Sequence, residues 1–247
     1  MSKLTVILPA AGKGTRLNLP YPKEILRLDK EKALIDFSFD FFRDCARDDI
    51  HFVVVINEHK TEIIEYLARY KDRYNISFTY QNPEELEYTG AIKSAKHLFG
   101  THNVVLLPDT IMKLPSGVDL ASAVEHSLQQ TGFVFLYKQE TDTEVLKTKG
   151  ALLIDDAGRV ASYEDKPEHP GQDFNAFWCS FAFKAETFDD CIAFMEKSTL
   201  DQGVDPDEIR STAIFQSKGL RVDDYMDLGT WGEIRRLIFE NAEQSMR

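Results

Sequence analysis

The sequence predicts an α/β fold in which helices cover a mostly parallel β-sheet. Short apolar runs suited to buried strands alternate with amphipathic segments of helical period. A glycine-rich loop directly follows the first apolar run. The length of 247 residues lies near the upper end of what one compact α/β domain occupies. We therefore predict a single domain over residues 1–247 that carries insertions.

Strands and helices are expected to alternate in the first half of the chain. The apolar runs predict strands over residues 4–8, 52–56, 76–80 and 104–107. The amphipathic segments between or after them predict helices over residues 33–47, 60–74, 89–99 and 120–130. No internal repeat and no linker rich in Pro, Gly or Ser divides this series.

The alternation of strand-like and helix-like segments ends after a further strand expected at residues 133–137. Two strand-like runs, 150–154 and 159–163, flank the turn sequence Asp155-Asp156-Ala157-Gly158 and predict a β-hairpin. This hairpin is interpreted as a small inserted β-rich lobe. The remaining elements are expected to be a strand at 177–183, a helix at 186–197, a strand at 220–222 and a helix at 230–243.

Composition predicts a soluble protein of the cytoplasm. Hydrophobic residues make up 43% and charged residues 28% of the chain, as in ordinary globular proteins. No stretch approaches the ~20 apolar residues of a membrane helix, so no membrane partner is expected. The chain passes from Met1, Ser2 and Lys3 directly into a short strand-like run, without the pattern of a signal peptide.

The charge balance favours a small ligand over a polyanion. A net charge of -12 would repel nucleic acid, whereas a local cluster of Lys, Arg and magnesium can still bind a small phosphorylated molecule. The three cysteines have neither an even count nor close spacing, and the six histidines show no metal-ligand spacing. We expect the cysteines to be buried. The oligomeric state is left open, with a homo-oligomer among the options.

The glycine loop is the most informative segment of the sequence. Small residues let backbone amides approach phosphates closely, and Arg16 and Lys23 supply positive charge. The loop residues are Ala10, Ala11, Gly12, Lys13, Gly14 and Thr15. The segment lacks the Gly-Lys-Ser/Thr of a P-loop, and Leu17 stands at the third glycine position of a dinucleotide fingerprint. The alternative is an ordinary turn with solvated cations.

Two aspartates are candidate ligands of a magnesium ion. Asp109 comes just past a buried strand, at the edge of the sheet where α/β proteins bind ligands. Asp227 follows the strand-like 220s and precedes the last helix. Magnesium prefers carboxylate oxygens together with phosphate oxygens and water. The alternatives are a turn residue for Asp109 and a helix N-cap for Asp227.

These motifs resemble the signature of the sugar-phosphate nucleotidylyltransferases, the family that contains glucose-1-phosphate thymidylyl- and uridylyltransferases. The resemblance implies a Rossmann-like sheet that binds a nucleoside triphosphate over the loop. It also implies that Arg16 and Lys23 are catalytic residues holding the β- and γ-phosphates, and that Asp109 and Asp227 hold Mg²⁺. The Leu-Pro-Ala-Ala-Gly form is closer to uridylyl and cytidylyl members than to the Ala-Gly-Gly form of many thymidylyl members.

The resemblance extends to base and acceptor contacts. It implies nucleotide-binding roles for Gln81, which could bond a pyrimidine edge, and Gly90, which lets backbone approach the base or ribose. The segment 163–167 resembles the family's Glu-Lys-Pro motif, but Asp165 stands immediately before the lysine, which leaves open which acid reaches the acceptor. The implied acceptor-binding residues are Gly150, Glu164, Asp165 and Lys166. The alternatives are an ordinary helix start and an exposed charged turn.

The expected reaction is transfer of a nucleoside monophosphate from the triphosphate to a sugar 1-phosphate, with release of pyrophosphate. An acceptor oxygen would attack the α-phosphorus in line, and no covalent enzyme intermediate is required. One alternative is a cytidylyltransferase acting on a phosphorylated alcohol or other non-sugar acceptor, with a changed pocket around residues 174–178. A noncatalytic nucleotide-binding module and a glycosyltransferase are further alternatives, and pyrophosphate release separates them from the expected reaction.

Overall fold

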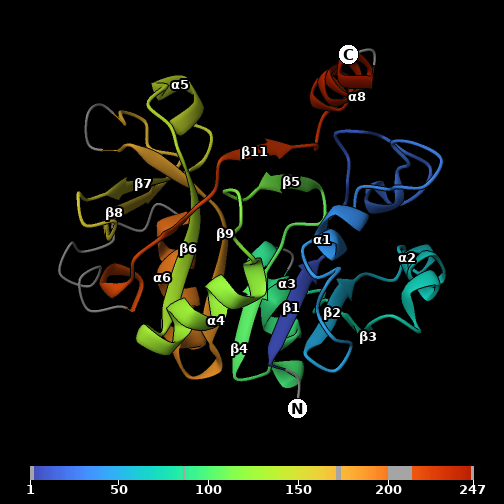
Figure 1. Cartoon of the computed structure of the whole chain (residues 1–247), viewed down its shortest axis with the longest axis horizontal. Coiled ribbons are helices and arrows are strands. Elements are labelled where there is room, and N and C mark those ends of the chain that lie inside the picture. The colour runs from blue at the N-terminus through green and yellow to red at the C-terminus, as the bar shows by residue number, and fades with distance from the viewer. Residues whose placement is uncertain (1–2, 86, 171–173, 200–212, 246–247) are drawn as a thin grey trace. The chain divides into compact units, whose positions relative to one another are not determined.

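The computed structural model describes residues 3–85, 87–170, 174–199 and 213–245 (Figure 1). Its architecture is the predicted α/β fold, with a central, mostly parallel β-sheet flanked by helices. The chain divides into two compact units. The glycine-loop unit comprises Val6–Leu98, Leu106–Met112 and Tyr225–Arg247, and the hairpin unit comprises Met1–Thr5, Phe99–Val105 and Lys113–Asp224. That residues 1–247 form a single domain stays a prediction.

Three neighbouring strands form the sheet of the glycine-loop unit. They are β1 (Leu4–Pro9), whose first two residues belong to the hairpin unit, β2 (Ile50–Ile56) and β3 (Asn75–Tyr80). β2 and β3 pair in parallel, with Phe52 opposite Ile76 and Ile56 opposite Tyr80. β1 and β2 are buried almost throughout, as expected of strands covered on both faces. The strands predicted at 4–8, 52–56 and 76–80 are confirmed.

The first two helices predicted in the glycine-loop unit, at 33–47 and 60–74, are shorter than the amphipathic pattern predicts. The predicted helix at 33–47 is α-helical only in α1 (Asp36–Asp40). The next two continue from α-helix into a 3₁₀ turn, α2 (Glu62–Leu67) into η2 (Ala68–Tyr70) and α3 (Tyr88–Ser94) into η3 (Lys96–Leu98). The other helical elements are η1 (Lys23–Ile25) and α8 (Trp231–Ser245), the latter close to the predicted helix at 230–243.

Asp36 fixes the start of α1 inside the predicted helix at 33–47. Its side chain is buried and accepts hydrogen bonds from the Ala33 N–H at 2.8 Å, from the Tyr66 hydroxyl and from the Tyr70 hydroxyl at 2.9 Å. These bonds hold a turn before α1. After α1 the backbone uses hydrogen bonds that span three residues, such as Phe42 N–H to the Phe39 carbonyl. Burial and Asp36 together raise the pKa of Tyr66 to about 12.

A small second sheet was missed by the sequence analysis. It pairs β5 (Thr110–Lys113) with β11 (Asp224–Asp227). Each strand is only four residues long and carries charged side chains, so neither produces an apolar run. The pairing fixes the position of Asp227, the last residue of β11.

The hairpin unit is built around the antiparallel strand β9 (Ala176–Lys184). β4 (His102–Val105) and β6 (Phe133–Gln139) pair with β9 on either side, and β10 (Leu220–Arg221) pairs in parallel with β6. The predicted hairpin is confirmed as β7 (Gly150–Ile154) and β8 (Val160–Asp165), which joins β9 through Ala151 opposite Phe177. β4 ends two residues earlier than predicted.

The helices of the hairpin unit agree well with their predicted positions. α4 (Leu120–Gln130) has the predicted bounds, because the Asp119 carboxylate caps it by accepting the Ser122 N–H at 2.8 Å. The predicted helix at 186–197 is η4 (Ala185–Thr187) followed by α6 (Phe188–Thr199). The sequence analysis missed α5 (Thr143–Leu146) and η5 (Ala213–Gln216), which are single turns.

Among the described residues, no helix combines the length and the apolar character needed to cross a membrane. Cys179 and Cys191 are buried, as predicted, and Cys45 is half-buried. Burial raises the pKa of the Cys191 thiol to about 12.

We expect Asp36→Ala to destabilise the protein by about 3 kcal/mol, because it leaves a buried N–H and two tyrosine hydroxyls without their acceptor. The matched control is Asp40→Ala, which breaks partly exposed surface pairs with Lys32 and Arg43 and should cost less than about 1 kcal/mol. Urea unfolding measures both. Equal losses would contradict the role assigned to Asp36.

Candidate functional site

The glycine loop leaves β1 with its backbone held against the end of β2. The Ala10 N–H donates to the Val55 carbonyl at 2.8 Å, and the Asn57 side chain donates to the Ala11 carbonyl at 2.6 Å. Gly14 has φ +63°, a left-handed conformation that favours glycine. A side chain at Gly12 would meet nothing within 4 Å. The loop therefore offers accessible backbone, as phosphate binding requires.

An ion pair joins Lys23 to Asp109. Lys23 opens η1, and Asp109 follows β4 by four residues, at the end of the chain's run through Leu106, Leu107 and Pro108. The ammonium group of Lys23 contacts Asp109 Oδ2, and both side chains are only 14% exposed. Partial burial protects this pair from solvent screening. The two predicted residues are thus brought together within the glycine-loop unit.

Asp227 and Arg16 meet at the same place in this unit. The Leu228 N–H donates to the Asp109 carbonyl at 2.9 Å, so the backbones carrying the two aspartates are adjacent. A Cβ on Gly229 would stand 2.8 Å from Arg16 Nη2 and 2.9 Å from Asp227 Oδ1. The side chains of Arg16 and Asp227 therefore both lie against Gly229. Only glycine leaves them this room.

Asp227 is not the N-cap of the last helix. α8 begins at Trp231, and the Glu233 N–H lies 3.4 Å from the Thr230 hydroxyl, which stands at the capping position. Asp227 Oδ1 instead accepts the Gly229 N–H at 2.9 Å. The carboxylate thus belongs to the turn that carries it next to Asp109.

The donor set fits a hard divalent cation. Asp109 and Asp227 offer oxygen ligands only, and no group of three or more His, Cys, Asp or Glu side chains with metal-binding geometry occurs among the described residues. An ion held here would complete its coordination shell with phosphate oxygens and water. Magnesium prefers such oxygen ligands, whereas zinc is usually bound by Cys and His. Binding of Mg²⁺ at these residues remains a prediction.

A cavity of about 350 Å³ opens beside the glycine loop. Its polar lining includes three lysines and two further side chains near the loop, namely Lys13, Lys23, Lys60, Asn57 and His59. Glu62 also lines the cavity, and Lys23 and Lys60 are each paired with a carboxylate. The cavity is therefore lined by charges of both signs.

Gln81 and Gly90 together shape the loop between β3 and α3. The side-chain amide of Gln81 donates to the Glu85 carbonyl at 2.5 Å and to the Glu87 carbonyl at 3.0 Å. A Cβ on Gly90 would stand 2.1 Å from the Glu85 carbonyl oxygen, so Gly90 is required by packing. The side-chain oxygen of Gln81 is an acceptor by chemistry. Its contact with a base remains a prediction.

The four residues predicted for the acceptor lie together in the hairpin unit. Gly150 pairs with Asp165 across β7 and β8, and Ala151 pairs with Glu164. A Cβ on Gly150 would stand 1.9 Å from the indole nitrogen of Trp178, so the indole packs directly on the glycine. Trp178 belongs to the range 174–178 that was expected to shape the pocket of the non-sugar alternative, and it lies against a residue predicted for the sugar acceptor.

Lys166 has an unusual backbone conformation. Its φ of +51° lies in the left-handed region, which is uncommon for a residue with a side chain and is frequent at functional sites. The side chain is 62% exposed, and its Nζ lies 3.5 Å from Asp165 Oδ2. Asp165, with 12% exposure, is the acid that pairs with this lysine, while Glu164 is exposed.

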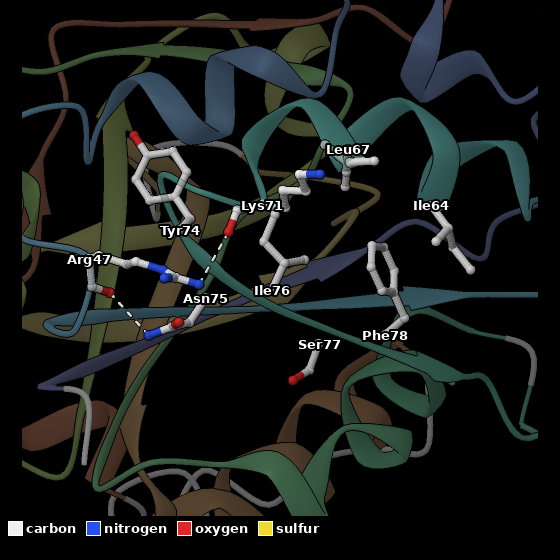
Figure 2. Close-up of a pocket in the computed structure, with 10 residues that line it drawn as sticks. Arg47, Ile64, Leu67, Lys71, Tyr74, Asn75, Ile76, Ser77 and Phe78 are labelled. Atoms are coloured by element: carbon white, nitrogen blue, oxygen red, sulfur yellow. Dashed lines mark hydrogen bonds between the residues drawn. The ribbon is translucent and has the colours of Figure 1, made fainter.

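A second cavity, of about 430 Å³, lies between α2 and β3 (Figure 2). Ile64, Leu67, Ile76 and Phe78 supply its apolar lining. At one end the Arg47 guanidinium donates to the Lys71 carbonyl at 3.1 Å, as Figure 2 shows. None of the predicted site residues lines this cavity.

A glycine loop at the end of the first strand of an α/β sheet, with two cations and two carboxylates beside it, is the arrangement that the sequence predicted for an α/β nucleotidyltransferase. The chain belongs to the nucleotidyl transferase family, whose model matches residues 4–241. The resemblance predicted from the sequence is thus confirmed.

Two of the similar proteins have glucose-1-phosphate in their names. The chain is 27% identical over 187 residues to a glucose-1-phosphate adenylyltransferase of Nitrosomonas europaea, a match that covers 68% of this chain and 41% of that protein. It therefore spans about two-fifths of that relative's length.

Two solved structures share the fold. One is a UDP-glucose pyrophosphorylase complexed with UDP-glucose, with a TM-score of 0.72, 17% identity and complete coverage of both chains. The other is a putative glucose-1-phosphate thymidylyltransferase from Bacillus anthracis, with a TM-score of 0.70, 17% identity and coverage of 96% of this chain and 94% of that one.

We expect Gly90→Ala to destabilise the protein by about 3 kcal/mol, because the new Cβ would collide with a backbone carbonyl that cannot move alone. The matched control is Gly232→Ala in α8, where the Cβ would meet only the Thr230 hydroxyl at 3.8 Å. That change should stabilise by up to about 1 kcal/mol through helix propensity. Urea unfolding measures both, and a loss in both variants would refute the packing argument.

Proposed function

We propose that this protein transfers a nucleoside monophosphate from a nucleoside triphosphate to a sugar 1-phosphate, releasing pyrophosphate. The observation that carries the proposal is the grouping of Arg16, Lys23, Asp109 and Asp227 in one unit with the glycine loop. Membership of the nucleotidyl transferase family supports it. The names of the similar proteins, which include a pyrophosphorylase solved with UDP-glucose, favour a sugar phosphate as the acceptor.

The glycine loop and two cations would bind the triphosphate. Backbone amides of residues 11–15 would face the phosphates, and Arg16 and Lys23 would hold the β- and γ-phosphate oxygens. Negative charge grows on these oxygens as pyrophosphate leaves, so fixed cations stabilise the transition state more than the bound substrate. The pair with Asp109 keeps Lys23 oriented before the substrate arrives.

Asp109 and Asp227 are the residues that would hold Mg²⁺. When bound, this ion supplies Lewis-acid charge neutralisation to the phosphate oxygens. The adjacent backbones of the two aspartates support this assignment, because a shared ion requires both carboxylates at one place.

The acceptor would be bound by residues of the hairpin unit. Lys166 neutralises the acceptor phosphate, which lowers its repulsion from the triphosphate. Asp165 or Glu164 would accept hydrogen bonds from sugar hydroxyls, and Gly150 leaves room for the Trp178 indole beside them. A phosphate monoester is already a nucleophile near neutral pH, so the attack on the α-phosphorus needs alignment rather than a general base.

The partners of the protein and its cellular location are part of the same proposal. The partners are a nucleoside triphosphate and a small phosphorylated acceptor, and the net charge of -12 argues against nucleic acid. The cytoplasm supplies both substrates. The base is assigned to no single nucleotide, although Gln81 favours one that can donate a hydrogen bond to its side-chain oxygen.

Pyrophosphate release with magnesium tests the proposal, measured for UTP, dTTP, CTP, GTP and ATP against sugar 1-phosphates, phosphocholine and other small phosphoesters. We expect one triphosphate and one sugar phosphate to be required together. Turnover only with a non-sugar phosphoester would establish the cytidylyltransferase-type alternative instead. Triphosphate binding without any pyrophosphate release would indicate a noncatalytic module.

Asp109→Ala should lower kcat by at least about 100-fold, because it removes both a metal ligand and the partner of Lys23. The control is Asp48→Ala, at an exposed carboxylate outside the site, which should leave kcat unchanged. The same pyrophosphate assay measures both variants. An active Asp109→Ala enzyme would remove Asp109 from the mechanism.

Lys166→Gly should raise the KM for the acceptor by about tenfold, the effect of losing about 1.4 kcal/mol of charge-assisted binding. Glycine tolerates the φ of +51°, so the fold should not weaken. Lys166→Arg keeps the charge and serves as the control. An unchanged acceptor KM in Lys166→Gly would exclude a contact between Lys166 and the acceptor.

A further inference from the structure

The residue that follows Lys23 belongs to a buried ion pair. Glu24 is 1% exposed and Lys60 is 5% exposed, and the Lys60 ammonium group donates to both carboxylate oxygens of Glu24, at 2.8 and 2.9 Å. The two residues are 36 positions apart in the chain. The proposed reaction assigns a role to neither.

The pair anchors the turn that carries Lys23. In η1 the Leu26 N–H donates to the Lys23 carbonyl at 2.9 Å, and the Ile35 N–H donates to the Glu24 carbonyl at 2.9 Å. The side chain of Glu24 adds the bond to Lys60. Residue 24 is therefore fixed through both its backbone and its carboxylate, which leaves the neighbouring Lys23 little freedom at its Cα.

Lys60 is in turn tied to the glycine loop. Its N–H donates to the Asn57 carbonyl at 3.1 Å, and the Asn57 side chain donates to the Ala11 carbonyl at 2.6 Å. Lys60 also lines the cavity beside the glycine loop together with Lys23. Lys60 therefore connects Glu24, the neighbour of Lys23, to the glycine loop through Asn57.

Burying this pair is costly. Desolvation raises the pKa of Glu24 and lowers the pKa of Lys60, and each shift is opposed by the partner's charge. A buried ion pair often adds no more stability than apolar side chains of the same volume. Stability alone therefore does not account for two charges at these positions.

We propose that Glu24 and Lys60 are a positioning pair that fixes Lys23 at the cavity beside the glycine loop, an inference that rests on the proposed function for the role of Lys23. In that reaction Asp109 is needed as a metal ligand, so Lys23 requires an anchor other than its ion pair with Asp109. The Glu24–Lys60 bond supplies it through the backbone.

The decisive variant is the double replacement Glu24→Met/Lys60→Met, which substitutes unbranched apolar side chains for both charges. We expect a melting temperature close to that of the wild type and a kcat lower by about 100-fold, the effect of a misplaced group near the reacting atoms. The KM for the acceptor should not change. Lys60→Arg retains the ion pair and should retain most of the activity.

A second measurement follows Lys23 without turnover. Competitive acetylation read by mass spectrometry compares the Lys23 amine with that of Lys13, an exposed lysine of the same loop. We expect the acetylation of Lys23 relative to Lys13 to rise several-fold in the double variant. Glu24→Gln, which keeps one acceptor for Lys60, should give a smaller rise and covers the case in which the double variant does not fold.

The two proposals fail in different ways. If the wild type releases no pyrophosphate with any substrate pair, the proposed function fails, and the acetylation of Lys23 still decides whether the pair positions it. If the folded double variant has wild-type kcat and wild-type Lys23 acetylation, the pair is only structural and the inference is overturned.

Discussion

The contact between Lys23 and Asp109 joins parts of the chain that are 86 positions apart. The arrangement of the candidate site beside the glycine loop depends on this contact. One partner comes from a 3₁₀ turn after the glycine loop, and the other comes from the segment after β4. Opposite charges that are both 14% exposed attract strongly enough to orient two flexible side chains before any substrate is present. The backbone bond from Leu228 to Asp109 then adds Asp227 to the same place.

Local pairing explains how an acidic chain can gather three lysines at one cavity. The net charge is -12, yet Lys13, Lys23 and Lys60 line one cavity beside the loop. Glu24 and Asp109 each compensate one of these lysines, so the cations can be gathered without prohibitive mutual repulsion. The fields that matter to a ligand are set by such neighbours and not by the total charge.

Apolar runs allowed the strands to be predicted, because buried parallel strands are continuous hydrophobic segments. The helix predicted at 33–47 was too long. Asp36 holds a turn before α1, and hydrogen bonds that span three residues replace the α-helix after it. Asp109 and Asp227 could be selected because each follows a strand-like run. Glu24 and Lys60 could not, because an ion pair between distant segments leaves no periodic pattern, and β5 and β11 are too short and polar to produce one.

The residues proposed for the triphosphate and for the acceptor belong to separate compact units. Each unit has its own strands and buried side chains, so a substitution near Lys166 or Trp178 need not disturb the packing around Lys23. Natural selection can then alter the choice of acceptor while the nucleotide chemistry is conserved, or the reverse. This independence recommends the hairpin unit as the first target for directed evolution of the proposed acceptor range.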